Sequence, residues 1–372
     1  MKENTTFRAI IACGGTGGHL FPGLAVAESL HERGHEVLLL VSEKEIDALA
    51  LKSHPQFRAE KLPSVGMPAM LLSPAFIGFL RRCWESYRQC RTIFRKFRPS
   101  VVLGMGGFTS TAPILAARLR GLPCYIHESN AIPGRANRLA ARFGAGVLLG
   151  FEECRQRFPS SRCIVTGTPV RKNLGAPMDR TEALKIFGLE PSRPTLLVTG
   201  GSQGAAGINQ VLFRASALLA QAGLQIIHLT GKNDDRLASA NYQRDGIPHY
   251  VAPFHHRMEE AYSAADLVVS RAGASSLSEL SEFALPSILI PYPHATDDHQ
   301  RANAEIYVKA GAALLAEEKT IVPEVFAATI WNLLNDPARR AAMAAAAKKP
   351  APESAANNVA DVLERAVEEG MA

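Results

Sequence analysis

At 372 residues the chain is long enough for two domains, and its 47% hydrophobic and 20% charged residues are ordinary for a globular protein. The net charge of +6 is spread along the chain without a Lys/Arg tract, so composition gives no reason to invoke nucleic acid. Six cysteines without a Cys-x-x-Cys pair indicate buried thiols in a reducing compartment. We find no signal peptide and no apolar run of about 18 residues, so we predict no spanning helix.

The first predicted strand, residues 7–13, leads into the sequence GGTGGH at residues 14–19. A helix is predicted over residues 20–30, with Pro22 tolerated in its first turn. The glycines therefore lie on a strand-to-helix turn, where backbone N–H groups and the helix N-terminus can approach an anion. The run differs from the plain Gly-x-Gly-x-x-Gly dinucleotide pattern, because it surrounds a threonine and ends in His19.

Strands and helices alternate through the rest of the first half. A helix is predicted over residues 111–120, and further strands are predicted at residues 36–41, 57–62, 100–104, 123–127 and 146–149. Alternation of this kind predicts a parallel sheet that is covered by helices on both faces.

The second half repeats the plan. A strand at residues 195–199 runs into a second glycine turn, GGSQGA at residues 200–205, and then into a helix that ends near residue 222. The next strands are predicted at residues 225–230, 250–252, 267–270 and 287–291. A Gly/Pro-containing linker is predicted at residues 167–171, and a final amphipathic helix at residues 355–368.

Loops at the strand ends are the most informative part of the sequence, because open parallel sheets bind ligands beyond the carboxyl ends of their strands. Clusters of glycine or polar residues follow strands at residues 104–110, 127–130, 271–279 and 297–300. Any one cluster is also typical of a cap or turn. Their recurrence at strand ends in both halves favours a binding site.

Several classes of chemistry are disfavoured by what the sequence lacks. Asp297, Asp298 and His299 suggest metal ligands, but no second ligand set stands at zinc spacing. No Gly-x-Ser-x-Gly elbow and no P-loop motif occurs, so a serine hydrolase or a P-loop ATPase is not predicted. His19 has two interpretations: it is a base or orienting residue at the mouth of the turn, or it only caps a helix.

Six motifs occur in order across nearly the whole chain and together resemble glycosyltransferase family 28, the family of the cell-wall N-acetylglucosaminyltransferase that makes lipid II. They are Gly14–His19, His127-Glu128-x-Asn130, Gly167-x-Pro169-Val170-Arg171, Gly200–Ala205, Arg271-x-Gly273-Ala274 and Asp298-His299-Gln300. Ser129 stands where the family usually has glutamine, and Cys13 where it commonly has a small residue.

The resemblance implies an α/β protein with the GT-B fold, in which two Rossmann-like parallel-sheet domains face a cleft. Residues 1–167 would bind the acceptor and the membrane, with a C-terminal helix at about 354–372 packing back on this domain. Residues 168–353 would bind UDP-N-acetylglucosamine. The implied activity is an inverting, metal-independent hexosyl transfer to the 4-hydroxyl of lipid I, giving lipid II without a cofactor.

The resemblance also assigns residues. His19 is the expected general base, with Glu128 as the alternative. Acceptor and phosphate contacts are expected from Gly14, Gly15, Gly106 and Gly107. Donor contacts and the cleft lining are expected from Thr16, Gly17, Gly18, Asn130, Arg171, Ser202, Gln203, Phe254, His255, Ala274, Ser275, Ser276, Glu279, His299 and Gln300. Glycine turns, helix N-termini and Arg171 would meet the diphosphate in place of a metal.

A membrane-binding patch is predicted between residues 67 and 84, where apolar and aromatic residues are followed by arginines. Its residues would be Met70, Leu71, Phe76, Phe79, Arg81, Arg82 and Trp84. The alternative is a buried helix pair. The patch predicts a peripheral protein at the cytoplasmic face of the inner membrane, with an anionic membrane surface and cell-wall synthesis and division proteins as partners besides its two substrates.

Three other classes of protein share parts of this pattern. A glycolipid glycosyltransferase or a UDP-N-acetylglucosamine epimerase shares the general plan, but the motifs at residues 127–130 and 200–205 favour lipid II synthesis. A dinucleotide-dependent oxidoreductase would need an acid at the next strand end, and Glu36 and Glu43 are wrongly placed for it. A non-enzymatic binding module would leave the two polar strand-end constellations unexplained.

Overall fold

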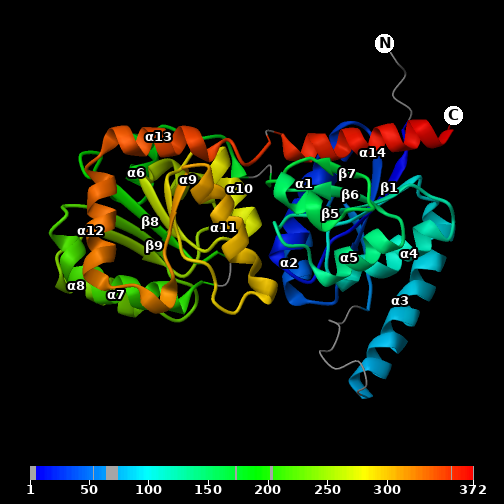
Figure 1. Ribbon diagram of the computed structural model, residues 1–372, viewed down its shortest axis with the longest axis horizontal. Helices are drawn as coiled ribbons and strands as arrows, with labels where there is room; N and C mark the ends of the chain where they lie inside the picture. Colours follow the sequence, from blue (N-terminus) through cyan, green and yellow to red (C-terminus); the bar gives the residue numbers. More distant parts are fainter. Residues whose placement is uncertain are drawn as a thin grey trace, which may run out of the picture. The chain divides into compact units, whose positions relative to one another are not determined.

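The structure, a computed structural model, describes residues 6–52, 54–63, 74–171, 174–201, 204–352 and 354–371. The chain divides into two compact units (Figure 1). The N-terminal unit is Met1–Lys172 with Pro352–Ala372, and the C-terminal unit is Asn173–Ala351.

The N-terminal unit is built on a sheet of seven strands in the order β3-β2-β1-β4-β5-β6-β7, all paired in parallel. The strands are β1 (Arg8–Ala12), β2 (Glu36–Val41), β3 (Arg58–Lys61), β4 (Val101–Gly104), β5 (Cys124–Glu128), β6 (Gly146–Leu149) and β7 (Cys163–Val165). Its helices are α1 (Gly17–Glu32), α2 (Glu45–Lys52), α3 (Pro74–Phe97), α4 (Thr111–Arg118), α5 (Arg135–Arg142) and α14 (Ala355–Met371), with short 3₁₀ turns η1 (Phe108–Ser110) and η2 (Glu152–Arg157).

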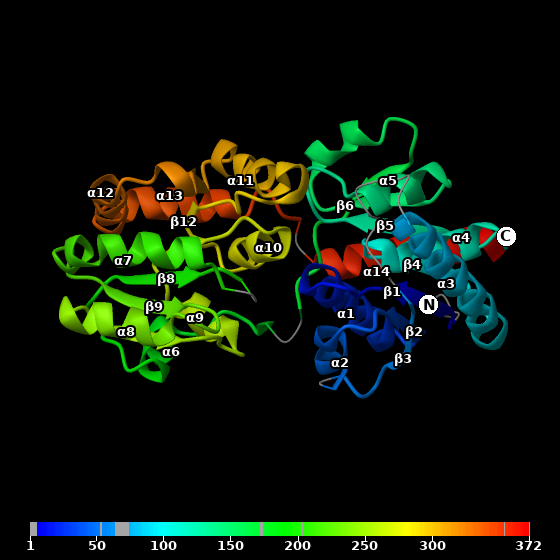
Figure 2. The same cartoon turned by 90° about the horizontal axis from the view of Figure 1, so that it is seen from below.

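Alternate residues of the central strands face two different layers of helices. Ile11 of β1 is buried in one core with side chains of α1 and α14. Ile10, its neighbour, is buried in a second core with side chains of α3, α4 and α5. Figure 2 shows α3 and α4 side by side in this unit. A strand buried on both faces explains the nearly continuous apolar runs of the sequence.

The C-terminal helix is fastened to α1 by polar contacts as well as by the core. Arg33 forms ion pairs with Asp361 at 2.6 Å and with Glu364 at 2.8 Å. Ser29 Oγ donates to Asn357 Oδ1 at 2.7 Å. Residues more than 320 positions apart in the chain are thereby joined in one unit.

The C-terminal unit has a six-stranded parallel sheet in the order β10-β9-β8-β11-β12-β13. The strands are β8 (Thr195–Thr199), β9 (Gln225–Leu229), β10 (His249–Ala252), β11 (Leu267–Ser270), β12 (Ser287–Leu289) and β13 (Ala313–Leu315). The helices are α6 (Arg180–Ile186), α7 (Ala206–Ala220), α8 (Asp235–Arg244), α9 (Met258–Ala264), α10 (Ala274–Glu282), α11 (His299–Lys309), α12 (Pro323–Leu334) and α13 (Pro337–Ala347), with 3₁₀ turns η4 (Thr296–Asp298) and η5 (Glu318–Thr320).

Two differences from the predicted elements have physical causes. The first helix begins at Gly17, so Pro22 lies in its second turn and the last part of the glycine run is already helical. Strand β13 was not predicted, because its three residues, Ala-Leu-Leu, favour helices and are too few to show a period of two. Within the described residues, no helix is both long and apolar enough to cross a membrane.

Candidate active site

Three of the predicted loops of the N-terminal unit follow neighbouring strands. Strand β1 pairs with β4, and β4 pairs with β5. The glycine turn after β1, the Gly106–Gly107 loop after β4 and the loop after β5 therefore lie along one edge of the sheet. The structure thus places these three loops at the carboxyl ends of neighbouring strands, where parallel sheets commonly bind ligands.

The first glycine turn is held from beneath by a buried acid. Gly15, at φ +92°, donates its N–H to the Asp47 carboxylate at 3.0 Å. Ser42 donates both its N–H and its hydroxyl to Asp47 Oδ2. A Cβ at Gly14 would lie 2.6 Å from this same oxygen, so only glycine fits there. The N–H of Gly15 is thus engaged by the protein itself, which leaves anion contacts to the helix N-terminus beyond it.

His19 lies in the first turn of α1 and packs against the loop after β4. A Cβ at Gly106 would lie 2.9 Å from Cε1 of His19, and one at Gly107 would lie 3.4 Å from its Cδ2. Both glycines have positive φ. The imidazole is half-buried and rests on a stretch of bare backbone. This is where the sequence analysis placed the general base.

Ser110 ties the loop after β4 to the end of β1. Its hydroxyl donates to the carbonyl of Gly106 at 2.8 Å or to that of Ala12 at 3.1 Å, and it accepts the N–H of Gly106 at 3.2 Å. Ser110 of η1 therefore holds Gly106 in place under His19 and links it to the end of β1.

Glu128, the alternative base, is buried with both carboxylate oxygens occupied. Oε1 accepts from the backbone N–H and the side-chain amide of Asn130 at 3.0 and 3.1 Å. Oε2 accepts from Gly134 N–H at 2.9 Å and from the Asn137 amide at 2.8 Å. Four donors on one carboxylate fix the loop and the start of α5. The Glu128 side chain therefore holds this loop in place.

The neighbouring His127 is a structural residue. Its Nε2 donates to the carbonyl of Gly167 at 2.8 Å, and its Nδ1 accepts from Ser129 Oγ at 3.2 Å. Complete burial lowers the pKa of His127, so the ring is neutral near pH 7. The serine that departs from the family pattern thus has a role in this chain. Farther along, the Arg171 guanidinium lies 4.6 Å from the centre of the Phe21 ring.

The second glycine turn follows β8 in the C-terminal unit. Gly201 donates its N–H to Thr199 Oγ1 at 3.2 Å. A Cβ at Gly200 would lie 2.3 Å from the carbonyl carbon of Gly204, which requires glycine at this close approach. Ser202 and Gln203, predicted donor contacts in this turn, lie outside the described residues.

Helix α10 begins next to that turn. A Cβ at Gly201 would lie 3.9 Å from Ser276 Oγ, which places the α10 N-terminus beside the glycine turn. The first helical hydrogen bond runs from Leu277 N–H to Gly273. The N–H groups of Ala274, Ser275 and Ser276 therefore precede the helical ladder, as expected of an anion site.

Glu279 stands one turn farther along α10 and is half-buried. The hydroxyl of Tyr262 on α9 donates to its Oε2 at 2.8 Å. This contact fixes the carboxylate that the sequence analysis assigned to the ribose hydroxyls. Arg271, just before α10, donates to the carbonyls of Ile290 and Pro291 at 3.1 Å and so joins the ends of β11 and β12.

The remaining predicted donor residues lie in loops after β10 and β12. Phe254 exposes 47% of its surface, and His255 Nε2 lies 2.9 Å from the Glu260 carboxylate. His299 and Gln300 open α11: His299 Nδ1 donates to the Thr296 carbonyl at 2.8 Å, and Gln300 Oε1 accepts the N–H of Tyr292 at 2.9 Å. These loops all follow carboxyl ends of strands in one sheet. Within the described residues, no group of three His, Cys, Asp or Glu side chains is placed to hold a metal ion.

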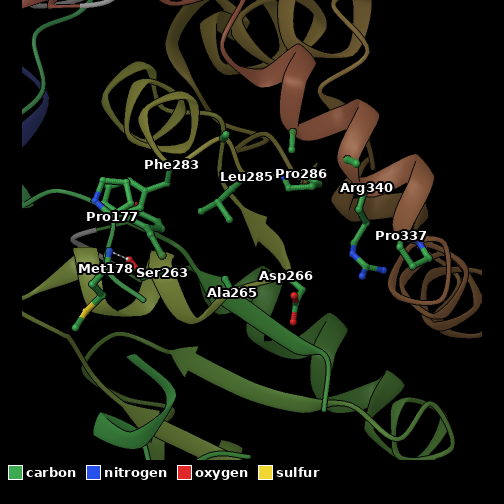
Figure 3. A pocket seen from close by; sticks show the side chains of 14 residues that line it. Pro177, Met178, Ser263, Ala265, Asp266, Phe283, Leu285, Pro286, Pro337 and Arg340 are labelled. Carbon is green, nitrogen blue, oxygen red and sulfur yellow. Dashed lines mark hydrogen bonds between the residues drawn. The ribbon is translucent and has the colours of Figure 1, made fainter. Parts of the chain in front are cut away.

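A pocket of about 380 Å³ in the C-terminal unit lies at the opposite edge of this sheet. Figure 3 shows Asp266, which precedes β11, and Leu285 and Pro286, which precede β12. Asp266 is already paired, with Arg180 at 2.7 Å and with the N–H of Thr195 at 2.8 Å. Because it opens at the amino ends of the strands, this pocket does not belong to the candidate donor site.

The family follows from two sequence models. The glycosyltransferase family 28 N-terminal domain matches residues 9–149, and the family 28 C-terminal domain matches residues 195–361. The chain belongs to glycosyltransferase family 28.

Relatives match this family 28 chain along nearly its whole length. A Geobacter sulfurreducens protein is 40% identical over 366 residues, 96% of this chain and 98% of the relative. A Halothermothrix orenii protein is 36% identical over 369 residues, 96% and 98% of the two chains. Both are named UDP-N-acetylglucosamine–N-acetylmuramyl-(pentapeptide) pyrophosphoryl-undecaprenol N-acetylglucosamine transferase.

Solved structures of glycosyltransferases are also similar to this chain over nearly its whole length. MurG of Acinetobacter baumannii has a TM-score of 0.77 at 29% identity, covering 97% of this chain and 99% of that one. The calicheamicin glycosyltransferase CalG4 has a TM-score of 0.69 at 14% identity, covering 98% and 99%, and shows the fold alone. The predicted fold class, two parallel-sheet α/β domains of the GT-B glycosyltransferases, is confirmed.

Helix α3 of this family 28 chain carries the described part of the predicted membrane patch. Ile77, Leu80 and Trp84, spaced i, i+3 and i+7, expose 71%, 51% and 60% of their surface on one face. Arg81 and Arg82 are exposed beside them. Phe79 differs from the prediction: it is buried and packs edge-on against Phe108 at 5.3 Å. Met70, Leu71 and the side chain of Phe76 lie outside the described residues.

Sequence reasoning missed the residues that position the candidate site. Asp47, Ser110, Asn137 and Tyr262 each hold a predicted residue or its loop in place. Ser110 ends the predicted cluster at residues 104–110, but the other three residues stand in no motif. Asp47 is 32 residues from the turn it supports. The one signal for Asp47 in the sequence was an acidic residue among the apolar residues of a short helix.

Proposed function

We propose that this chain transfers N-acetylglucosamine from UDP-N-acetylglucosamine to the 4-hydroxyl of undecaprenyl-diphospho-N-acetylmuramoyl-pentapeptide, lipid I, and so makes lipid II. The observation that carries this proposal is the 36–40% identity, over 96% of the chain, to relatives named for that transfer. The two sets of strand-end loops support it, because a two-substrate transfer needs a site for each substrate.

The C-terminal unit binds the donor in this proposal. Backbone N–H groups of Ala274, Ser275 and Ser276 meet the diphosphate, and Glu279, fixed by Tyr262, accepts the ribose hydroxyls. The loop around Phe254 and His255 reads uracil, and His299 with Gln300 binds the sugar hydroxyls. Ser202, Gln203 and Arg171 complete the diphosphate contacts. These donors make a metal ion and a cofactor unnecessary.

The N-terminal unit binds lipid I. Gly106 and Gly107, together with the helix N-terminus at Thr16–Gly18, cradle its diphosphate, and Asn130 lines the acceptor side. The exposed face of α3, with Arg81, Arg82 and Trp84, rests on the anionic surface of the cytoplasmic face of the inner membrane, where a lipid-linked acceptor is found. Other cell-wall synthesis and division proteins are proposed as partners there.

The chemistry is a single displacement. The acceptor hydroxyl oxygen forms a bond to the anomeric carbon as the bond from that carbon to the diphosphate oxygen breaks, so the configuration inverts. His19 takes the hydroxyl proton, and UDP leaves with the electron pair of the broken bond. We assign the base to His19 because its ring is half-buried on bare backbone, whereas both oxygens of Glu128 already accept hydrogen bonds.

Incubation of the purified chain with both substrates and EDTA tests the proposal. We expect UDP and lipid II in equal amounts, with a β-linkage by nuclear magnetic resonance. Release of UDP without lipid II, epimerisation of the sugar nucleotide, or restoration of activity only by magnesium or manganese would each contradict a stated part of it.

A further inference from the structure

A second, smaller pocket in the N-terminal unit is lined by residues of α3, α4 and η1. Figure 1 shows α3 next to α4 in this unit. Phe79 and Tyr87 of α3 line one side, and Phe108 and Leu115 line the other. The pocket is about 60 Å³. Since an apolar cavity of about 150 Å³ holds benzene, this volume admits roughly two or three carbon atoms, such as a methyl branch and its neighbours.

The pocket begins where the proposed acceptor diphosphate site ends. Phe108 directly follows Gly107, and its ring packs on Phe79 at 5.3 Å with an interplanar angle of 89°. On the other side, Tyr87 contacts Trp84, with ring centres 5.6 Å apart. Trp84 belongs to the exposed face of α3. Two aromatic pairs, one next to Gly107 and the other reaching the exposed face of α3, therefore flank the pocket.

One polar atom in the pocket points to more than a hydrocarbon ligand. Thr111 Oγ1 is buried and forms no hydrogen bond with any part of the chain that the structure describes. A buried hydroxyl without a partner is unfavourable. An alkyl diphosphate carries an ester oxygen at its first carbon, which is an acceptor for this hydroxyl. Arg82 stands at the rim, paired with Glu43 at 3.4 Å and half-exposed.

We infer that this pocket binds the diphosphate-proximal isoprene unit of the acceptor and so selects a methyl-branched prenyl chain over a straight one. The inference rests on the proposed placement of the acceptor diphosphate at Gly106 and Gly107. The pocket then contributes to the selection of the acceptor substrate, and this effect is distinct from the general attraction of α3 to a membrane.

Competition against lipid I tests the inference with two probes: a two-isoprene prenyl diphosphate and a straight-chain alkyl diphosphate of equal carbon number. We expect the prenyl probe to inhibit about four-fold more strongly, the effect of burying the one methyl branch of the bound isoprene unit. Ala112→Leu, which fills the pocket from α4, should abolish that preference. Thr92→Leu, at an exposed position on α3, should preserve it.

Thr111→Val provides a second test without a change of volume. It should weaken inhibition by the prenyl probe several-fold and leave the KM for the donor unchanged. Equal inhibition by the two probes in the native chain, a full prenyl preference in Ala112→Leu, or native-like inhibition of Thr111→Val by the prenyl probe would overturn the inference. Lipid II synthesis by the native chain at saturating lipid I is measured alongside. This measurement tests the proposed function independently of the prenyl preference. If neither probe nor inorganic diphosphate competes, the placement of the acceptor diphosphate fails, and the inference fails with it.

Discussion

Two side chains of the N-terminal unit compete for the role of general base, and their surroundings separate them. His19 lies half-buried over Gly106 and Gly107, while Glu128 is buried under four donated hydrogen bonds. We expect His19→Ala to lower kcat by about 10²–10⁴-fold with the donor KM unchanged. The acid limb of the pH–rate profile, where the base takes up a proton, should disappear. His31→Ala, at an exposed position of the same helix, is the matched control.

Glu128→Gln should behave differently, because an amide has one acceptor oxygen where the loop supplies donors to two. We expect a lower melting temperature and a lower kcat, with the acid limb retained. If the acid limb persists in His19→Ala and is lost in Glu128→Gln, the base is Glu128.

The donor site contains a pair of side chains that can be separated by mutation. Glu279→Ala should raise the donor KM far more than it lowers kcat, because a ribose contact exists in both ground and transition states. Tyr262→Phe removes only the hydroxyl that donates to Glu279 at 2.8 Å, so it should raise the donor KM by a smaller factor. Steady-state kinetics at saturating acceptor measures both, and an unchanged donor KM in Glu279→Ala would contradict the assignment.

At the scale of elements, the first glycine turn depends on a carboxylate from α2. Asp47 accepts from Gly15 and twice from Ser42, and an asparagine would turn an NH₂ group toward some of these donors. We expect Asp47→Asn to destabilise the N-terminal unit by about 1–3 kcal/mol and to lower kcat. Binding of UDP should stay at the native level. Calorimetry and equilibrium dialysis measure the two effects, and a native-like kcat would show that the turn keeps its shape without the acid.

We expect a buried histidine to make the C-terminal unit acid-sensitive. His228 of β9 contacts Tyr242 of α8 at 2.8 Å and Asn209 of α7 at 3.0 Å, and burial lowers its pKa to about 3. The neutral form is favoured in the fold, so unfolding takes up a proton below the unfolded pKa of about 6.5. From about pH 6.5 down toward 3, the opening constant of β9 should rise by about ten-fold per pH unit from this group.

Hydrogen exchange of the β9 amides between pH 7 and pH 5 measures this effect. His228→Gln has no titrating group, so its opening constant should be larger at pH 7 but much flatter with pH. An equally steep dependence in the variant would assign the acid sensitivity to other residues.

At the scale of the whole molecule, exposed apolar side chains occur on helices of both units, and on α3 they lie beside two exposed arginines, Arg81 and Arg82. Trp84→Ser should weaken binding to vesicles of anionic phospholipid, because it removes an aromatic side chain that is 60% exposed beside Arg81 and Arg82. Trp331→Ser on α12, where the tryptophan is 48% exposed, is the matched control and should bind like the native chain. Co-sedimentation measures both variants.

Much of the fold was predictable from local patterns. The apolar runs, the two glycine turns and the alternation of strands with helices identify two parallel sheets, because buried parallel strands and tight strand-to-helix turns leave strong local signals. Gly106 and Gly200 are local signals of the same kind, since each glycine stands where a Cβ has no room. The motifs in order along the chain also identified the family.

Tertiary structure decided how the candidate site is supported and which candidate base is available. The hydrogen bonds of Glu128 come from a loop and a helix that sequence cannot place around it, and they distinguish it from His19. The burial of Phe79 depends on Phe108, 29 residues away, so a continuous apolar run gave no sign of which side chain faces inward. The sequence by itself determined the elements and the family through short-range regularities, whereas the partners of each polar group depend on contacts between distant segments.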